Sequence, residues 1–227
     1  MDLLPFIIDG ILILIFISQI FRGRRKGFFA MVFSLVATAV SVLISYEYSA
    51  PIAEWINDTF VQKAAVNALS DAISSHLSSG TQAVLDAIPD YITKAAEASG
   101  VTVSGIVSDI GSSFDVTQAA ELIYAGIYEI LIHPILYVVV FVAVYAISNA
   151  ILSFGIKFFN NIFKLPVLKT LNKTFGGVVG ALKGIVIVVI LSIVLVVVAP
   201  ILPEEFGGAI NSSIIPNMVE EISLKVW

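Results

Sequence analysis

Cysteine is absent from this chain of 227 residues, and histidine occurs only twice, at His76 and His133. Without a thiol the chain can form no disulfide scaffold, thiolate metal site or iron–sulfur cluster, and it has no cysteine nucleophile. Two histidines are too few for most catalytic metal sites, and His76 has no second histidine or carboxylate cluster at ligand spacing. We therefore expect neither a metal ion nor a cofactor.

Charge is also scarce in this sequence. Only 13% of the residues are charged and 58% are apolar, whereas a soluble domain is about 25% charged. This composition excludes a disordered chain and argues against an ordinary water-soluble enzyme. The net charge of −5 argues against nucleic-acid binding. The composition is that of a membrane protein.

Four long apolar stretches are present. A helix rises about 1.5 Å per residue and the hydrocarbon core is roughly 30 Å thick, so a span needs about 20 apolar residues. Because the backbone must satisfy its own hydrogen bonds in hydrocarbon, each stretch is predicted to be a helix. We expect an all-α, polytopic membrane protein with four transmembrane helices, at residues 3–21, 28–46, 134–154 and 184–202.

The basic residues predict the orientation of these spans. Segments 22–27 and 155–183 hold 9 of the 12 basic residues and none of the acidic ones. Lys and Arg beside spans are retained in the cytoplasm, so both termini are expected outside the cytoplasmic membrane of a bacterium; the inverted topology is the alternative. The predicted cytoplasmic turn consists of Arg22, Gly23, Arg24, Arg25, Lys26 and Gly27.

The same reasoning divides the chain into a transmembrane hairpin (1–46), an extracytoplasmic helical module (47–133), a second hairpin (134–202) and an outer tail (203–227). The module has 87 residues, 11 of them acidic and 2 basic. Its apolar residues recur at helical spacing, which predicts amphipathic helices inserted between the second and third spans. Gly80 and Pro89 are predicted to interrupt them, and Asp115 with Gln118 has the spacing of a capping box.

Lysines alternate with aromatic and aliphatic residues in segment 155–183. A basic, aromatic-rich segment between two spans is predicted to lie flat on the inner leaflet, with its lysines near anionic headgroups; a plain connector is the alternative. The lysines predicted to contact lipid are Lys157, Lys164, Lys169, Lys173 and Lys183.

Asp9 is the one acidic residue inside a predicted span. It lies 13 residues before Arg22, or roughly 20 Å along a helix, where a carboxylate is usually paired or functional. Thr38, Ser41 and Tyr145 fall at a similar height, and we expect Asp9 to bond with hydroxyls of this layer. The alternative is a shifted first helix that leaves Asp9 in water at the interface.

Two rows of small residues predict close helix packing. Ser34, Thr38, Ser41 and Ser45 share one face of the second span, and small hydroxylated residues let helices approach each other; a pore lining is the alternative. A second row of small residues lies near the start of the fourth span and forms two overlapping small-xxx-small motifs. Its members are Gly176, Gly180 and Gly184.

Two segments together carry a family resemblance. One runs from Ile8-Asp9-Gly10 to Gly23-Arg24-Arg25-Lys26-Gly27-Phe28, and the other runs from Leu171-Asn172-Lys173-Thr174-Phe175-Gly176 to Leu182-Lys183-Gly184-Ile185. The chain resembles the colicin V production protein family, multi-spanning proteins of the bacterial cytoplasmic membrane. The matching positions are Asp9, Gly23, Arg25, Lys26, Gly27, Gly176, Gly180, Lys183 and Gly184.

The resemblance implies a role in producing or secreting a peptide toxin, and in envelope homeostasis, but it supplies no enzymatic activity. Module 47–133 departs from the family pattern. We expect a non-enzymatic membrane component or scaffold that contacts anionic lipids inside, together with a protein partner or further copies of itself. The alternative is a small homo-oligomeric transporter or channel. We find no credible catalytic pair for an intramembrane enzyme.

Overall fold

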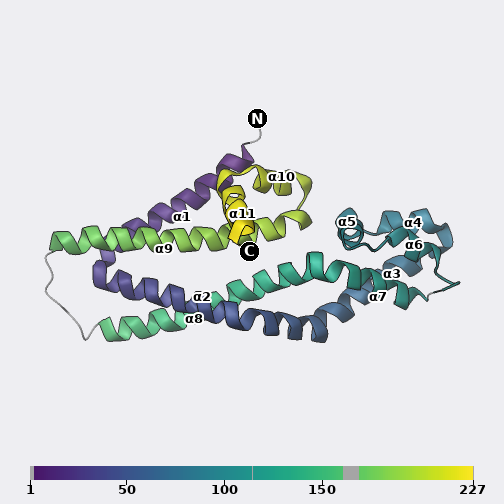
Figure 1. Cartoon of the computed structure of the whole chain (residues 1–227), viewed down its shortest axis with the longest axis horizontal. Coiled ribbons are helices and arrows are strands. Elements are labelled where there is room, and N and C mark those ends of the chain that lie inside the picture. Colours follow the sequence, from purple (N-terminus) through teal and green to yellow (C-terminus); the bar gives the residue numbers. More distant parts are fainter. Residues whose placement is uncertain (1–2, 114, 161–168, 227) are drawn as a thin grey trace. The chain divides into compact units, whose positions relative to one another are not determined.

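A computed structural model describes residues 3–113, 115–160 and 169–226 (Figure 1). It is 91% helical, and the part of the chain that it describes contains no strand. Four helices are long and apolar enough to cross a membrane. These findings confirm the prediction of an all-α protein with four helices of transmembrane type.

The chain forms two compact units. The terminal unit consists of Met1–Tyr48 and Phe141–Trp227, and the central unit consists of Ser49–Val140. Two long helices belong partly to each unit: α2 (Phe28–Ile56) and α8 (His133–Asn160). Helix α2 is followed directly by the π-helical turn η1 (Asn57–Val61) and α3 (Gln62–His76), so the second predicted span does not end at residue 46.

The terminal unit also contains α1 (Leu4–Lys26) and α9 (Lys169–Val198). Both helices are longer than their predicted spans. Helix α1 continues through the basic residues that were predicted to form a turn, and only Gly27, at φ 84°, separates it from α2. Arginine and lysine are good helix formers, whereas the left-handed region that Gly27 occupies favours glycine.

Segment 155–183 also differs from its prediction. Its described parts are the end of α8 and the first half of α9, and neither is a separate interfacial segment. The glycines of α9 do not end the helix, because another helix packs against them. Residues 161–168, including the predicted lipid contact Lys164, lie outside the described residues, as do the side chains of Lys157 and Lys169.

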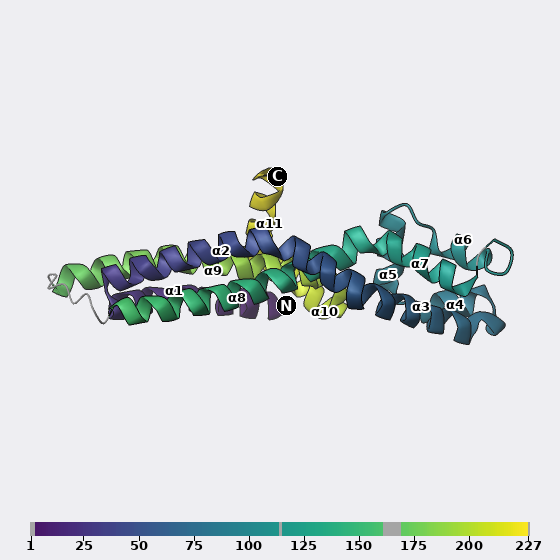
Figure 2. The ribbon, with the colours of Figure 1, turned by 90° about the horizontal axis from the view of Figure 1, so that it is seen from below.

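The C-terminal tail is helical and folds back onto the terminal unit. The 3₁₀ turn η4 (Ala199–Ile201) leads into α10 (Glu204–Ser212) and then α11 (Ile214–Val226). Both tail helices contact α1 and α9. Helix α11 projects crosswise to α1 and α9 in Figure 2. The tail therefore belongs to the packed structure of this unit.

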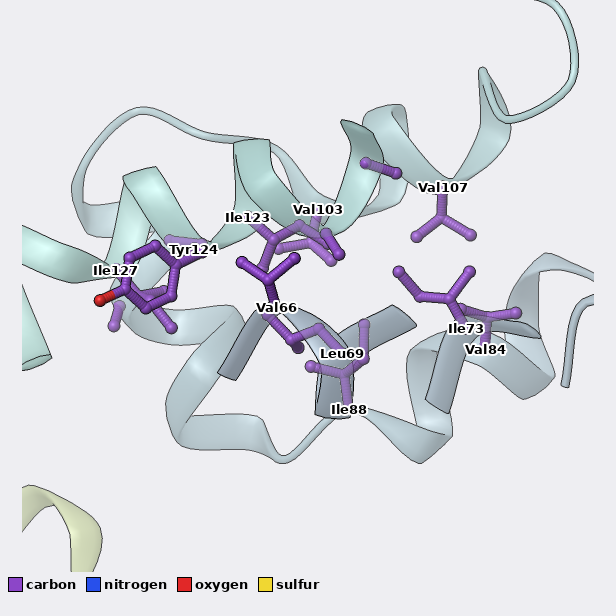
Figure 3. Packing of buried hydrophobic residues seen from close by; sticks show 14 of the residues in the cluster. Val66, Leu69, Ile73, Val84, Ile88, Val103, Val107, Ile123, Tyr124 and Ile127 are labelled. Carbon is purple, nitrogen blue, oxygen red and sulfur yellow. The ribbon is translucent and has the colours of Figure 1, made fainter. Parts of the chain in front are cut away.

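The central unit has its own hydrophobic core (Figure 3). Helix α7 (Val116–Ile127) packs on α3 (Gln62–His76) and α5 (Asp90–Ala98), and α4 (Thr81–Ala87) packs on α6 (Val103–Ser108). Two short turns, η2 (Leu77–Ser79) and η3 (Tyr128–Ile132), complete the unit. The side chains labelled in the core are Val66, Leu69, Ile73, Val84, Ile88, Val103, Val107, Ile123, Tyr124 and Ile127.

Three local predictions for this unit are confirmed. The side chain of Asp115 accepts from the backbone N–H of Gln118 at 2.8 Å, and the Gln118 side chain accepts from Asp115 N–H at 3.0 Å, so the capping box is present. Gly80, at φ 98°, separates η2 from α4. Pro89 stands immediately before α5.

Candidate functional site

The two sequence segments that carry the family resemblance meet where α1 and α9 pack side by side (Figures 1 and 2). Gly23 faces Gly176, Gln19 faces Gly180, and Phe16 faces Gly184, so the two helices run antiparallel. A Cβ on Gly23 would overlap the carbonyl oxygen of Gly176, and a Cβ on Gly180 would overlap that of Gln19.

The glycines therefore bring two backbones into direct contact, as the small-xxx-small pattern predicted. Gly10, on the same helix as Gly23, has nothing within 4 Å of a Cβ built on it. In α1, close contact with another helix therefore occurs at Gly23 and not at Gly10.

The N-terminal end of α9 also contacts the junction between α1 and α2. The backbone N–H of Phe28, the first residue of α2, donates to Oδ1 of Asn172 at 2.6 Å. The rings of Phe28 and Phe175 meet edge to face with centroids 6.0 Å apart. An Asn side chain from α9 therefore satisfies an N–H that the first turn of α2 leaves without an intrahelical partner.

Lys183 is buried, with its side chain only 9% exposed. Its predicted contact with lipid headgroups stays a prediction. Its Nζ donates to Oγ of Ser34 on α2 at 2.8 Å. By contrast, five other basic residues of these segments are exposed: Arg22, Arg24, Arg25, Lys26 and Lys173.

Asp9 is buried, at 8% exposure, but it does not join the predicted hydroxyl layer. Its Oδ2 accepts from Ile214 N–H at 2.9 Å and its Oδ1 accepts from Ile215 N–H at 3.0 Å. The carboxylate therefore caps the N-terminus of α11, where the helix dipole favours a negative charge. Tyr145 of the predicted layer accepts from Nδ2 of Asn149 on its own helix at 3.5 Å.

Asp9, Lys183 and the glycines of the two motif segments thus contact distant parts of the terminal unit. The family model described as colicin V production protein matches residues 8–107 and 101–223. The chain belongs to the colicin V production protein family. No curated protein and no solved structure matches it.

In this colicin V production family protein the predicted hydroxyl row of α2 is buried. Thr38 donates to the carbonyl of Ser34 at 2.9 Å, Ser41 to that of Ala37 at 2.7 Å, and Ser45 to that of Ser41 at 2.7 Å. The three hydroxyl groups thus donate to backbone carbonyls of α2 itself. The row therefore has the features of a packing face, as the sequence analysis favoured.

Sequence reasoning missed two contacts of the family protein. It did not find Asn172 as the cap of α2, or the α11 amides as the partners of Asp9. Each pair is far apart in the chain, by 144 residues for Phe28 and Asn172 and by 205 for Asp9 and Ile214. The sequence contained only a general indication, namely that an intramembrane carboxylate needs hydrogen-bond donors.

Among the described residues, no group of three or more His, Cys, Asp or Glu could hold a metal ion.

Proposed function

We propose that this family protein is a non-enzymatic component of the bacterial cytoplasmic membrane that assists the production or secretion of a peptide toxin and envelope homeostasis. One observation carries the scaffold role. The motif glycines Gly23, Gly176 and Gly180 form a backbone-to-backbone contact between α1 and α9. Such a contact makes a rigid frame on which other proteins can assemble.

The orientation follows from the positive-inside rule. The basic end of α1 and the start of α9 lie in the cytoplasm near anionic lipids, and both termini lie outside with the central unit. The module 47–133 is strongly acidic, with 11 acidic and 2 basic residues. This charge suits an extracytoplasmic protein partner with a basic surface, or another copy bound through its few cations, and it disfavours nucleic acid.

A small homo-oligomeric transporter or channel is the alternative function. A conducting path needs polar groups that can replace the hydration shell of the transported species. The α2 hydroxyls that could supply them already donate to carbonyls of their own helix, which favours the scaffold. Solute flux through vesicles that contain the purified protein would support the transporter instead.

A complementation experiment tests the proposal. In a bacterium that secretes a toxin of the colicin V kind, the gene is deleted and active toxin is measured in the medium and in the cells. The deletion strain is expected to release less toxin, and the wild-type gene and the Gly10→Ala variant should restore release. The Gly180→Ala variant should not, because its Cβ overlaps the Gln19 carbonyl oxygen. Unchanged toxin release in the deletion strain would refute the proposal.

A further inference from the structure

The ammonium group of Lys183 is buried, and no carboxylate among the described residues forms an ion pair with it. It donates to Ser34 Oγ, which accounts for one of its three N–H donors. The charged groups that act on it most strongly are Lys26 and Arg22, both of the same sign. A buried ammonium needs an opposite charge or further acceptors to offset its loss of hydration.

The two helices that hold Lys183 and Ser34 carry no acidic residue near either side chain. Residues 10–46 and 134–203 contain neither Asp nor Glu. After Lys183 the next carboxylate in the sequence is Glu204, 21 residues later, or roughly 31 Å at the helical rise. On α2 the first is Glu47, 13 residues after Ser34, or roughly 20 Å away. Neither α9 nor α2 therefore supplies a counter-ion for Lys183.

Asp9 on α1 is also out of reach. The pairing of Phe16 with Gly184 and of Gln19 with Gly180 places Lys183 beside residues 16–19 of α1. Asp9 lies at least 7 residues beyond that level, roughly 10 Å along the axis, and its two oxygens already accept from the α11 amides.

The ammonium group of Lys183 lies toward the same end of the terminal unit as Arg22 and Lys26. Side chains of a helix lean toward its N-terminus, and the N-terminal end of α9 is the end where Asn172 contacts Phe28. Lys183 therefore extends toward the end where Arg22 and Lys26 lie. These two side chains are exposed, so they are accessible at the rim of the unit toward which the Lys183 side chain leans.

The neighbouring surface is apolar. Phe21 is 58% exposed and Phe29 is 41% exposed, beside Arg22 and close to Lys26 in the chain. A ligand with one anionic group and long apolar chains matches both surfaces, because its anion meets the cations and its chains meet the exposed rings. A free inorganic anion would match the cations alone.

We propose that Arg22, Lys26, Lys183 and Ser34 form a binding site for the phosphate group of an anionic phospholipid in the inner leaflet. The site deepens the proposed function, since it rests on the orientation given above. Arg22 and Lys26 hold the phosphate at the rim, and the ammonium of Lys183 donates to one of its oxygens. The bound lipid supplies the charge that the chain lacks at this position.

Lipid binding to the purified full-length protein in neutral detergent tests the site. The protein is titrated with phosphatidylglycerol or with phosphatidylcholine, and bound lipid is counted by native mass spectrometry. The informative variants are Lys183→Met and the double variant Arg22→Gln/Lys26→Gln, and the matched control is Lys63→Met, at an exposed lysine of the central unit. Each informative variant loses a charge-assisted hydrogen bond to the phosphate and should bind phosphatidylglycerol more weakly by roughly ten-fold or more.

Wild type and Lys63→Met should bind one phosphatidylglycerol in preference to phosphatidylcholine. Equal binding by Lys183→Met and Lys63→Met would overturn the proposal, as would equal binding of the two lipids by wild type. Displacement of the lipid by inorganic phosphate at similar concentration would overturn it too, because the site would then recognise a free anion. If Lys183→Met does not fold, the double variant Arg22→Gln/Lys26→Gln still tests the site, because it changes only exposed side chains. The lipid-binding measurement does not depend on toxin release. A negative result in the lipid experiment is therefore distinguishable from a failure of the proposed function.

Discussion

Oδ2 of Asp9 lies 2.9 Å from the backbone nitrogen of Ile214, so a carboxylate near the start of α1 caps the last helix of the chain. The same carboxylate accepts from Ile215 through its other oxygen. The hydroxyl of Ser213, just before α11, donates to the carbonyl of Ala209 at 2.7 Å and lies 3.3 Å from that of Pro5. The two ends of the chain are thus joined around α1, and the C-terminal helices depend on a residue that α1 supplies.

Replacing Asp9 should loosen α11. Asp9→Asn keeps one acceptor and removes the charge that faces the helix dipole, with an expected loss of about 1–2 kcal/mol in the free energy of unfolding. Amide hydrogen exchange at Ile214 and Ile215 should become faster. Glu205→Gln, at an exposed carboxylate of α10, is the control. Unchanged exchange at both amides in Asp9→Asn would show that the cap does not hold α11.

Gly180→Ala should destabilise the α1–α9 contact. The added Cβ overlaps the Gln19 backbone oxygen, and overpacking of this kind costs about 1–3 kcal/mol. The midpoint of thermal unfolding in detergent should fall. Gly10→Ala adds the same methyl group in open space and should not lower the midpoint, because alanine is the better helix former. An equal fall of the midpoint in the two variants would show that the α1–α9 contact is not what Gly180→Ala disturbs.

Asn172→Ala should weaken the junction between α1 and α2. The Phe28 N–H loses its acceptor, and loss of a helix cap costs about 0.5–2 kcal/mol. The measurement is the free energy of unfolding in detergent. Lys173→Ala, at the adjacent exposed residue, is the control. Equal stabilities of the two variants would argue against a capping role for Asn172.

Tyr124→Phe should destabilise the central unit. The Tyr124 hydroxyl donates to the Asn57 side chain, and both residues are buried. An unsatisfied buried acceptor costs about 1–3 kcal/mol, so the unfolding midpoint should fall. Tyr91→Phe removes a hydroxyl from an exposed ring and should have little effect. A fall of the same size in both variants would contradict a specific role for the Tyr124 bond.

Single-cysteine labelling should report the orientation without background, since the natural chain has no cysteine. Ser112→Cys lies in the central unit and Lys173→Cys near the start of α9, and both positions are exposed. A membrane-impermeant maleimide should label Ser112→Cys in intact spheroplasts and Lys173→Cys only after lysis. The reverse pattern would establish the inverted topology.

The sequence by itself determined the helical class, the four long apolar helices, the capping box at Asp115 and the glycine row of α9. These features depend on hydropathy, length and spacing within one segment, and local periodicity records them. The family was also accessible, because its motif residues keep their order along the chain.

Only the tertiary structure decided what the polar residues of the long helices contact. Asp9 bonds with amides 205 residues later, and Lys183 bonds with Ser34, 149 residues away. The ends of α1 and α9 also differed from prediction, because arginine and lysine are good helix formers and the glycines of α9 pack against α1. Such partners are selected by the packing of distant segments, and the spacing of residues along one segment contains no record of them.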